Sequence, residues 1–340
     1  MRFGSLALTL GAAAAGGLLL EAADLPAGLL IGATLGAAAM AVAGRGAAVP
    51  DRLRDAGFAM IGLSLGSSLE RETLSSAGDW PLSLAGMVVA LIVTWAICTA
   101  ILSRLFGLGR TTALLATSPG ALSYALAIAE PRPDVDLRVV TLVQSVRLLT
   151  VTVAIAPMLG GIGSAAITTD VPRMGTPSSI LLLVAALVLT RPLASMRIPA
   201  PALLSGVAVA AASHLPGFVR GAMDPHLVAI GFVLTGAVIG LRLRGTGTDD
   251  LRRLGPAAVM AAATAIATTG LIALLAAPAL ELHWTQLWLA WAPGGVEAMT
   301  ALALSSGIDP AFVASHHVAR LLLLFVVMPW LLGSARDRSP

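Results

Sequence analysis

The sequence is poor in charge and has no lysine. Only 11% of its 340 residues are charged and 57% are hydrophobic, whereas about a quarter of residues carry a charge in soluble domains. We therefore expect a membrane protein. Polar stretches between apolar segments rarely exceed roughly 15 residues, too short to bury a core, which excludes a separate soluble domain. The arginines are scattered singly or in pairs, which does not favour nucleic-acid binding.

Metal-ligating and nucleophilic residues are scarce too. The single cysteine, Cys98, lies in an apolar run; this excludes a disulfide framework and indicates a buried, small hydrophobic side chain. The five histidines form no HExxH, facial-triad or Cys/His cluster for a metal. No GxSxG, Walker loop or dinucleotide fingerprint occurs. We therefore predict no cofactor, no metal and no catalytic residue, and do not expect an enzyme.

What the sequence does contain is a series of apolar segments, each near the length of about 20 residues that crosses a bilayer. They lie at 4–20, 26–44, 55–69, 81–106, 112–129, 137–160, 178–195, 199–216, 225–243, 255–279, 286–306 and 311–333. This pattern is typical of an all-α polytopic membrane protein.

The chain also repeats itself at an offset of 173 or 174 residues. SPGALSYALAIAE aligns with APGGVEAMTALAL, which places Pro119 on Pro293, and further along Arg147 falls on Arg320. We predict two copies of one six-segment unit, at residues 1–170 and 171–340. The first segment is similar to a signal peptide, but its counterpart at 178–195 indicates that it stays in the mature protein.

The placement of arginine predicts how the copies are oriented, because cytoplasmic loops carry the positive excess. If every segment crossed, ten loop arginines would lie inside and nine outside; if 112–129 and 286–306 enter and leave on one side, sixteen lie inside and three outside. A simple kink would not restore this bias. We therefore expect two inverted repeats, each of about five transmembrane helices and one re-entrant or broken Pro-Gly helix. Both termini are expected in the cytoplasm, beneath a bacterial plasma (inner) membrane.

Inverted repeats with interrupted helices are the architecture of secondary transporters, whose site lies near the midplane. Pro293 lacks an amide hydrogen and Gly294 and Gly295 permit unusual dihedrals, so the chain is expected to unwind and restart there as a half-helix. Glu297 falls in its first turn, either as a helix-capping acid or as a proton or cation carrier. Ser123 occupies the matching place in the first copy, so the half-sites are chemically unequal.

Two arginines, Arg147 and Arg320, lie near mid-membrane, where each needs a partner. Arg320 either pairs with Glu297 or binds an anionic group with its bidentate fork, whereas Arg147 has no acid in its own Pro-Gly segment and is the better anion-binding candidate. His316 and His317 either relay protons or only pack and hydrogen-bond. The candidate substrate-binding or ion-binding residues are Pro119, Gly120, Ser123, Tyr124, Gln144, Arg147, Pro293, Gly294, Gly295, Glu297, His316, His317 and Arg320.

These two Pro-Gly segments, with the residues that follow them, resemble the AbrB family of bacterial membrane proteins over almost the whole chain. The resemblance implies the duplication and a PGG…H…R signature at Pro293, Gly294, Gly295, His317 and Arg320. The first copy departs from that signature at Ala121 and Gln144. Members of the family are labelled both ammonia monooxygenases and regulators of gene expression.

Neither label matches a pattern in this sequence. A monooxygenase needs the missing metal ligands, and no helix-turn-helix, basic helix or soluble DNA-binding domain fits the loops. We expect a secondary transporter or exporter of a small anionic or zwitterionic solute, proton-coupled through Glu297. The alternative is a membrane-embedded regulator acting through a partner. The expected partners are the lipid bilayer and a small-molecule solute, without direct nucleic-acid contact; whether the chain forms a homo-oligomer is left open.

Overall fold

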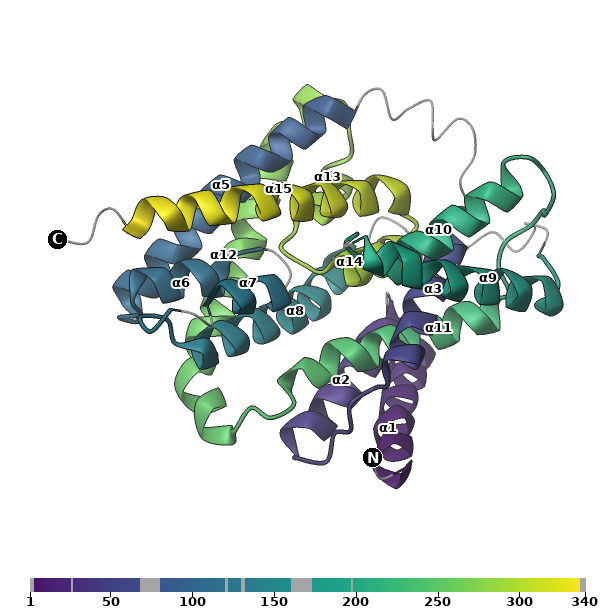
Figure 1. Ribbon diagram of the computed structural model, residues 1–340, viewed down its shortest axis with the longest axis horizontal. Coiled ribbons are helices and arrows are strands. Elements are labelled where there is room, and N and C mark those ends of the chain that lie inside the picture. The colour runs from purple at the N-terminus through teal and green to yellow at the C-terminus, as the bar shows by residue number, and fades with distance from the viewer. Residues whose placement is uncertain are drawn as a thin grey trace. The chain divides into compact units, whose positions relative to one another are not determined.

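Every predicted apolar segment contains at least one helix in the computed structural model, which describes residues 3–25, 27–67, 80–119, 122–129, 132–159, 173–196 and 198–336 (Figure 1). The helices are α1 (Phe3–Ala22), α2 (Gly28–Val42), α3 (Asp51–Ser67), α5 (Trp80–Leu105), α6 (Arg110–Thr117), α7 (Leu122–Ala129), α8 (Leu137–Leu159), α9 (Thr176–Ser195), α10 (Pro201–His214), α11 (Pro225–Gly240), α12 (Thr248–Leu280), α13 (Trp284–Trp291), α14 (Val296–Ser305) and α15 (Pro310–Arg336). A short 3-10 turn, η2 (Leu241–Leu243), follows α11. Within the described ranges, β structure is limited to one bridge between Arg173 and Ala222.

Within the described ranges, six helical segments are long and apolar enough to cross a membrane, by length and composition: α1, α5, α8, α9, α11 together with η2, and α12. Several of the remaining helices, such as α2 with 15 residues and α10 with 14, are apolar but shorter. The expected all-α polytopic membrane fold is therefore confirmed. The inverted orientation of the two copies and the cytoplasmic position of both termini stay predictions.

The two Pro-Gly segments are broken helices. Residues 118–121 separate α6 from α7, and residues 292–295 separate α13 from α14. The residue before each proline leaves the helical region, with ψ of 127° at Ser118 and 144° at Ala292, because the proline ring clashes with a helical residue before it. Since proline also has no amide hydrogen to continue the ladder, the same dipeptide ends a helix at the same place in both halves.

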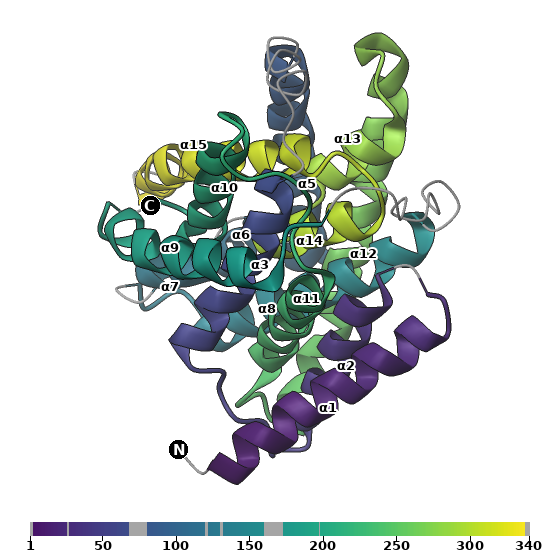
Figure 2. The ribbon, with the colours of Figure 1, turned by 90° about the vertical axis from the view of Figure 1, so that its right-hand side faces the viewer.

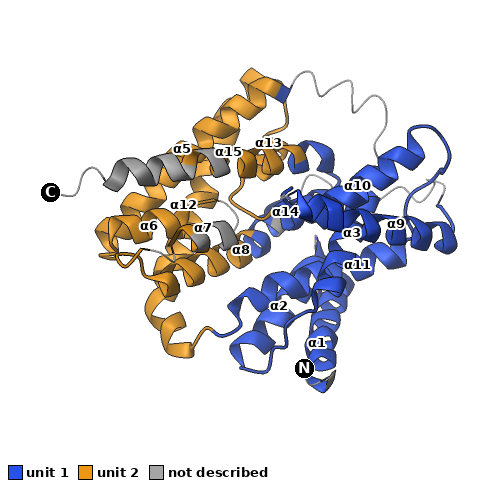
Figure 3. Ribbon diagram, in the orientation of Figure 1, with its two compact units in different colours: residues 1–80, 152–245, 296–314 blue, residues 81–151, 246–295, 315–340 orange. Residues whose placement is uncertain are grey.

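The chain divides into two compact units (Figure 3). Unit 1 consists of residues 1–80, 152–245 and 296–314, and unit 2 of residues 81–151, 246–295 and 315–340. Each unit therefore draws helices from both predicted copies, α1 to α3 with α9 to α11 in unit 1, and α5 and α6 with α12 and α13 in unit 2. The two copies at 1–170 and 171–340 therefore stay a prediction from the sequence repeat. Their boundaries differ from those of the two compact units.

Unit 1 is built by close helix pairs. Helix α1 lies along α2 (Figure 2), α2 packs on α11, and α3 packs on α10. A Cβ at Gly62 would overlap the backbone carbonyl of Leu203, and one at Gly236 would lie 2.6 Å from the carbonyl oxygen of Leu30. Glycine is therefore required at both places, since small residues let helix backbones approach closely inside a membrane.

The core of unit 2 holds the half-helix α6 in place. Leu102 of α5, Leu115 of α6, Val143 of α8 and Ala258 of α12 are fully buried in one cluster. The indole nitrogen of Trp95 on α5 also donates a hydrogen bond to a backbone carbonyl of α6. The half-helix α6 thus shares its core with α5, α8 and α12, and this packing positions the site.

Candidate functional site

Side chains from α8 cap the end of half-helix α6. The last carbonyls of a helix have no intrahelical donor, and Thr117 and Ser118 at the end of α6 are buried away from water. Arg147 Nη1 donates to the carbonyl oxygens of Thr117 at 2.9 Å and Ser118 at 3.0 Å. Gln144 Nε2, one turn earlier, donates to the Leu115 carbonyl oxygen at 2.8 Å. A buried cation at a helix C-terminus is also favoured by the helix dipole.

The end of half-helix α13 is capped in the same way from α15. Arg320 donates from Nη1 to the Ala292 carbonyl oxygen at 2.6 Å and from Nη2 to that of Gly294 at 2.5 Å. His317 Nε2 lies 3.0 Å from the Leu289 carbonyl oxygen; because a carbonyl only accepts, Nε2 carries the hydrogen. Donors in the two halves are offset by 173 residues and acceptors by 174. The partners that both buried arginines need are therefore backbone carbonyls.

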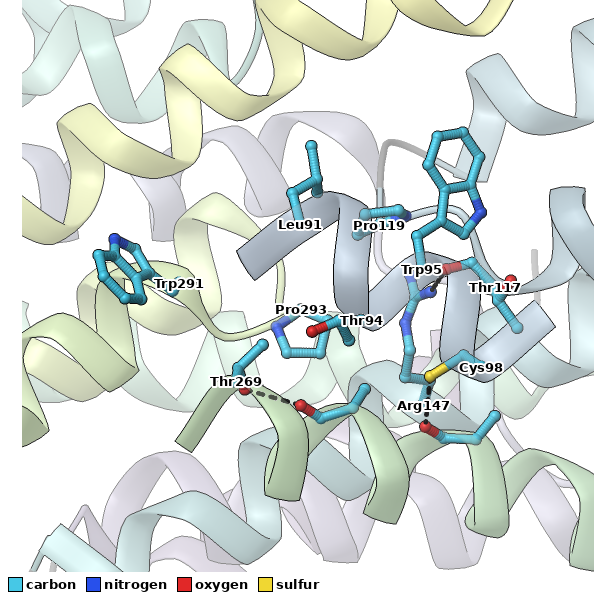
Figure 4. Close-up of a pocket in the computed structure, with 12 residues that line it drawn as sticks. Leu91, Thr94, Trp95, Cys98, Thr117, Pro119, Arg147, Thr269, Trp291 and Pro293 are labelled. Carbon is cyan, nitrogen blue, oxygen red and sulfur yellow. Dashed lines mark hydrogen bonds between the residues drawn. The ribbon is translucent and has the colours of Figure 1, made fainter. Parts of the chain in front are cut away.

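Both helix breaks reach one small cavity inside unit 2 (Figure 4). Pro119 of the first break and Pro293 of the second both line it, together with Arg147. The other lining residues are Leu91, Thr94, Trp95, Cys98, Thr117, Ala261, Ala265, Thr269 and Trp291. Its volume of about 20 Å³ is room for about one water molecule. Residues 174 positions apart in the sequence thus line the same cavity.

Two uncharged hydrogen-bond donors in this lining have no partner among the described residues. The Cys98 thiol lies 3.5 Å from the Ala261 carbonyl oxygen, and the Thr269 hydroxyl donates to that of Ala265 at 2.7 Å. The buried Thr94 hydroxyl and Trp291 indole nitrogen have no hydrogen-bond partner among the described residues. Leaving a buried donor unsatisfied costs about 1–3 kcal/mol, so a bound acceptor would recover free energy here.

The charge in this lining is positive. Arg147 and Trp291 stand toward opposite sides of the cavity in Figure 4, with Pro293 and Thr94 between them. Arginine, an indole N–H and a hydroxyl are all donors, while the described lining supplies no acidic side chain. An arrangement of this kind favours a small anion or the carboxylate of a zwitterion.

Glu297 belongs to unit 1, where it is half-buried in the first turn of α14. Its carboxylate is within electrostatic range of the Arg242 guanidinium, in the turn η2. Sequence reasoning treated Arg242 as a loop residue and did not single it out. The pair predicted between Glu297 and Arg320 would join the two units and stays a prediction.

The two adjacent histidines face different partners. His316 Nε2 is 2.9 Å from the Ser83 hydroxyl oxygen of α5, while His317 contacts α13. The buried His317 Nδ1 has no partner in the described part of the chain. Neither histidine is among the described residues that line the cavity, so a proton relay through them stays a prediction.

The remaining predicted site residues are described only in part. Gly294 is buried and Gly295 half-buried in the second break. Gly120, and the side chains of Ser123 and Tyr124, lie outside the described residues. Within the described residues, no three His, Cys, Asp or Glu side chains form a cluster that could hold a metal ion.

Several lining residues were missed by sequence reasoning. Thr94 and Thr269 each stand inside a long apolar helix, and Trp291 directly precedes the second break. A hydroxyl in an apolar span and a position next to an interrupted helix are signals that could have found them. Cys98 was expected to be buried and small, which is confirmed by its 3% exposure, but its place in the cavity was not foreseen.

Comparison with known proteins yields one family and two relatives. Residues 29–335 match the family described as "Transition state regulatory protein AbrB". The protein named "Putative regulator AbrB" from Escherichia coli (strain K12) is 25% identical over 323 residues, which cover 91% of this chain and 90% of that protein. The protein named "Uncharacterized protein YhjN" from Bacillus subtilis (strain 168) is 25% identical over 295 residues, covering 80% of this chain and 76% of that protein.

Proposed function

This chain belongs to the AbrB family, and we propose that it is a secondary transporter or exporter of a small anionic or zwitterionic solute. One observation carries the proposal: both helix breaks line one buried cavity, whose other lining includes Arg147 and the unsatisfied donors of Thr94 and Trp291. Paired, interrupted helices around a central site are the arrangement on which secondary transporters operate.

The small volume of the cavity corresponds to a closed state in this proposal. Room for about one water is too little for an organic anion, so the walls must move apart to admit one. The broken helices provide places for that movement, because Ser118 and Pro119 lie beyond the end of α6, and residues 293–295 lie between α13 and α14. Arg147 remains tied to two carbonyl oxygens, which fixes its charge at the site.

Coupling to protons is assigned to Glu297. Its carboxylate is half-buried near Arg242 in unit 1, and the chain runs from Glu297 directly into the second break. Protonation of an acid within electrostatic range of an arginine changes the local charge balance. In this proposal, that change is passed to the cavity through residues 292–296.

Reconstitution of the purified full-length protein into liposomes tests the proposal. The probes are radiolabelled acetate, succinate, glutamate, glycine and phosphate, and proton movement is followed with an enclosed pH-sensitive dye. We expect flux of at least one probe together with proton movement. Glu297→Gln should retain solute exchange and lose proton coupling, whereas Thr94→Val should weaken solute recognition. Absence of both flux and proton movement over this panel would contradict the proposal.

The description of the family and the name of the Escherichia coli relative favour a second candidate function. In that alternative, the chain is a membrane-embedded regulator of gene expression that acts through a partner. A transcription profile of a deletion strain separates the two. A regulator should restore the profile even when Glu297→Gln and Arg320→Gln, combined in one protein, leave no proton-coupled transport, whereas a transporter with secondary effects on expression should not.

A further inference from the structure

A larger groove lies on unit 2, lined by residues of α5, α6 and α15. Its volume is about 710 Å³, within the range of roughly 300–1,000 Å³ typical of small-molecule sites. Along α5, the lining residues from Val88 to Arg104 recur at spacings of three and four. They therefore form one continuous helix face, about 24 Å long at 1.5 Å per residue.

This groove is apolar along most of its length and polar at one end. Val88, Ile92 and Ala96 line its first turns, and the two basic groups, Arg104 and Arg110, stand where α5 ends and α6 begins. Both arginines are exposed, and neither forms an ion pair within the described residues. The buried Ser103 hydroxyl at the same end also has no hydrogen-bond partner in that part of the chain.

We propose that the groove binds an anionic phospholipid of the surrounding bilayer. Its phosphate lies against Arg104 and Arg110, with Ser103 as a further donor, and one acyl chain runs along α5 toward Val88. Arginine is suited to phosphate because its fork donates two parallel hydrogen bonds, and basic groups at the cytoplasmic ends of spans attract anionic lipids. Both arginines are among the sixteen that the positive-inside count predicts on the cytoplasmic side.

The shape of the groove argues against other occupants. A small soluble anion would use the arginines but not the long apolar face from Val88 to Ala100. A neutral hydrocarbon would use that face but leave two cations and a hydroxyl without partners. Only a molecule with a charged head and a long apolar tail satisfies both ends.

The proposed lipid would also touch the wall of the buried cavity. Leu91 and Trp95 line both the groove and the cavity. The Trp95 indole is held by its hydrogen bond to the carbonyl oxygen of Leu114, which lines the groove as well. An acyl chain at this place would support that wall, whatever the cavity carries, so the lipid site does not depend on the proposed transport function.

Native mass spectrometry of the delipidated, detergent-purified protein tests the inference. The probes are phosphatidylglycerol and phosphatidylcholine with identical acyl chains. We expect one phosphatidylglycerol to bind at least tenfold more tightly than phosphatidylcholine. Arg104→Gln with Arg110→Gln should abolish that preference, whereas the matched pair Arg252→Gln with Arg253→Gln, also exposed on unit 2, should retain it.

The acyl part of the site is tested by filling the groove. Ala96→Trp should weaken phosphatidylglycerol binding about tenfold, while Ile97→Trp, one residue along and outside the groove, should leave it unchanged. Equal affinity of the wild-type protein for both lipids overturns the inference. So does a loss in either control variant as large as in its partner, or unchanged binding in Ala96→Trp. Thermal midpoints verify that each variant is folded.

Discussion

At the residue scale, the two buried arginines each bind carbonyl oxygens at the end of a broken helix. Arg147 also lines the cavity. Arg147 and Arg320 satisfy carbonyls that no helical amide can reach. Gln144 and His317 repeat that function one turn earlier with chemically different side chains. A sequence comparison of the two halves counts Gln144 as a departure from the signature, but its hydrogen bond is equivalent.

This equivalence predicts that glutamine can replace His317. In His317→Gln, an amide donor replaces Nε2 at the Leu289 carbonyl oxygen, so the thermal midpoint should stay near that of the wild type. His317→Ala removes the donor and should cost about 1–3 kcal/mol. Thermal unfolding of both variants in detergent measures the difference.

The same pair of variants examines the histidine as a proton relay. Glutamine cannot accept and release a proton, so a stable His317→Gln protein that loses proton movement in liposomes would support the relay. Full proton movement in that variant would assign His317 a purely structural role. A His317→Gln protein as unstable as His317→Ala would contradict the hydrogen bond.

Cys98 offers a second prediction, because it is the only cysteine and lines the cavity. Conversion of its thiol to a methyl disulfide with methyl methanethiosulfonate adds volume where there is room for about one water. Flux should therefore fall at least tenfold, as measured in the liposome assay. Cys98→Ala should transport and resist the reagent. Full flux in wild-type protein that mass spectrometry shows to be completely modified would be incompatible with a site in this cavity.

At the element scale, the ends of the helices follow local rules. The helix breaks occur where Ser118 and Ala292 precede proline, and helix α11 begins at Pro225, directly after its N-cap Asp224. These boundaries were accessible from the sequence because they depend on neighbouring residues. The sequence did not predict which helices pack together. A glycine that permits a close helix contact looks the same in the sequence as a glycine that faces no partner helix.

Adding one methyl group therefore predicts opposite effects at two glycines. Gly11→Ala meets nothing within 4 Å and should stabilise α1 by up to about 1 kcal/mol, since alanine favours a helix over glycine. Gly62→Ala meets the Leu203 carbonyl and should cost about 1–3 kcal/mol or more through overpacking. Thermal midpoints of the two variants should thus move in opposite directions; a shift of equal sign would contradict the α3 and α10 contact.

The Asp224 cap predicts a dependence on pH. Its carboxylate accepts a hydrogen bond from the Thr176 hydroxyl at 2.6 Å and one from the His226 amide at 2.9 Å, which lower the pKa of Asp224 in that order. A lowered folded-state pKa gives stability that is present above the unfolded value of about 3.9 and is lost as the pH falls through the folded value.

The thermal midpoint of Asp224→Asn should accordingly lie below that of the wild type from pH 7 to about pH 5, with the gap closing below about pH 4. Asp249→Asn controls for the loss of one negative charge. A gap that widens on acidification would have the wrong sign for this cap.

At the scale of the whole molecule, the compact units cut across the order of the sequence. Helices α1 to α3 pack with α9 to α11, although the corresponding helices of the two copies begin 173 or 174 residues apart in the sequence. Both predicted copies contribute to each unit, and so neither copy is expected to fold without the other. The orientation of the copies in the membrane is a separate property, which the arginine count predicts.

Cysteine labelling tests that orientation on a Cys98→Ala background. With the Pro-Gly segments entering and leaving on one side, single cysteines in Arg138→Cys and Arg244→Cys should react only from the cytoplasm, and in Arg220→Cys only from outside. If every segment crosses the membrane, all three sides are reversed. That result would make the copies parallel and remove the architectural argument for a transporter.

The sequence by itself determined that the chain lies in a membrane, where its helices fall and where two of them break. Apolar length and the missing amide hydrogen of proline act over a few residues, so no distant contact is needed to read them. The family was also readable from the Pro-Gly segments, and its assignment is confirmed.

Only the tertiary structure decided how these parts make a site. It placed Pro119 and Pro293 in the lining of one cavity, tied Arg147 and Arg320 to backbone carbonyls, and left donors of Thr94 and Trp291 in that cavity unsatisfied. The physical reason is that such contacts join helices far apart in the sequence. These contacts form only when particular apolar helix surfaces pack against each other. Because the helices have similar apolar compositions, many different packings are compatible with the same sequence pattern.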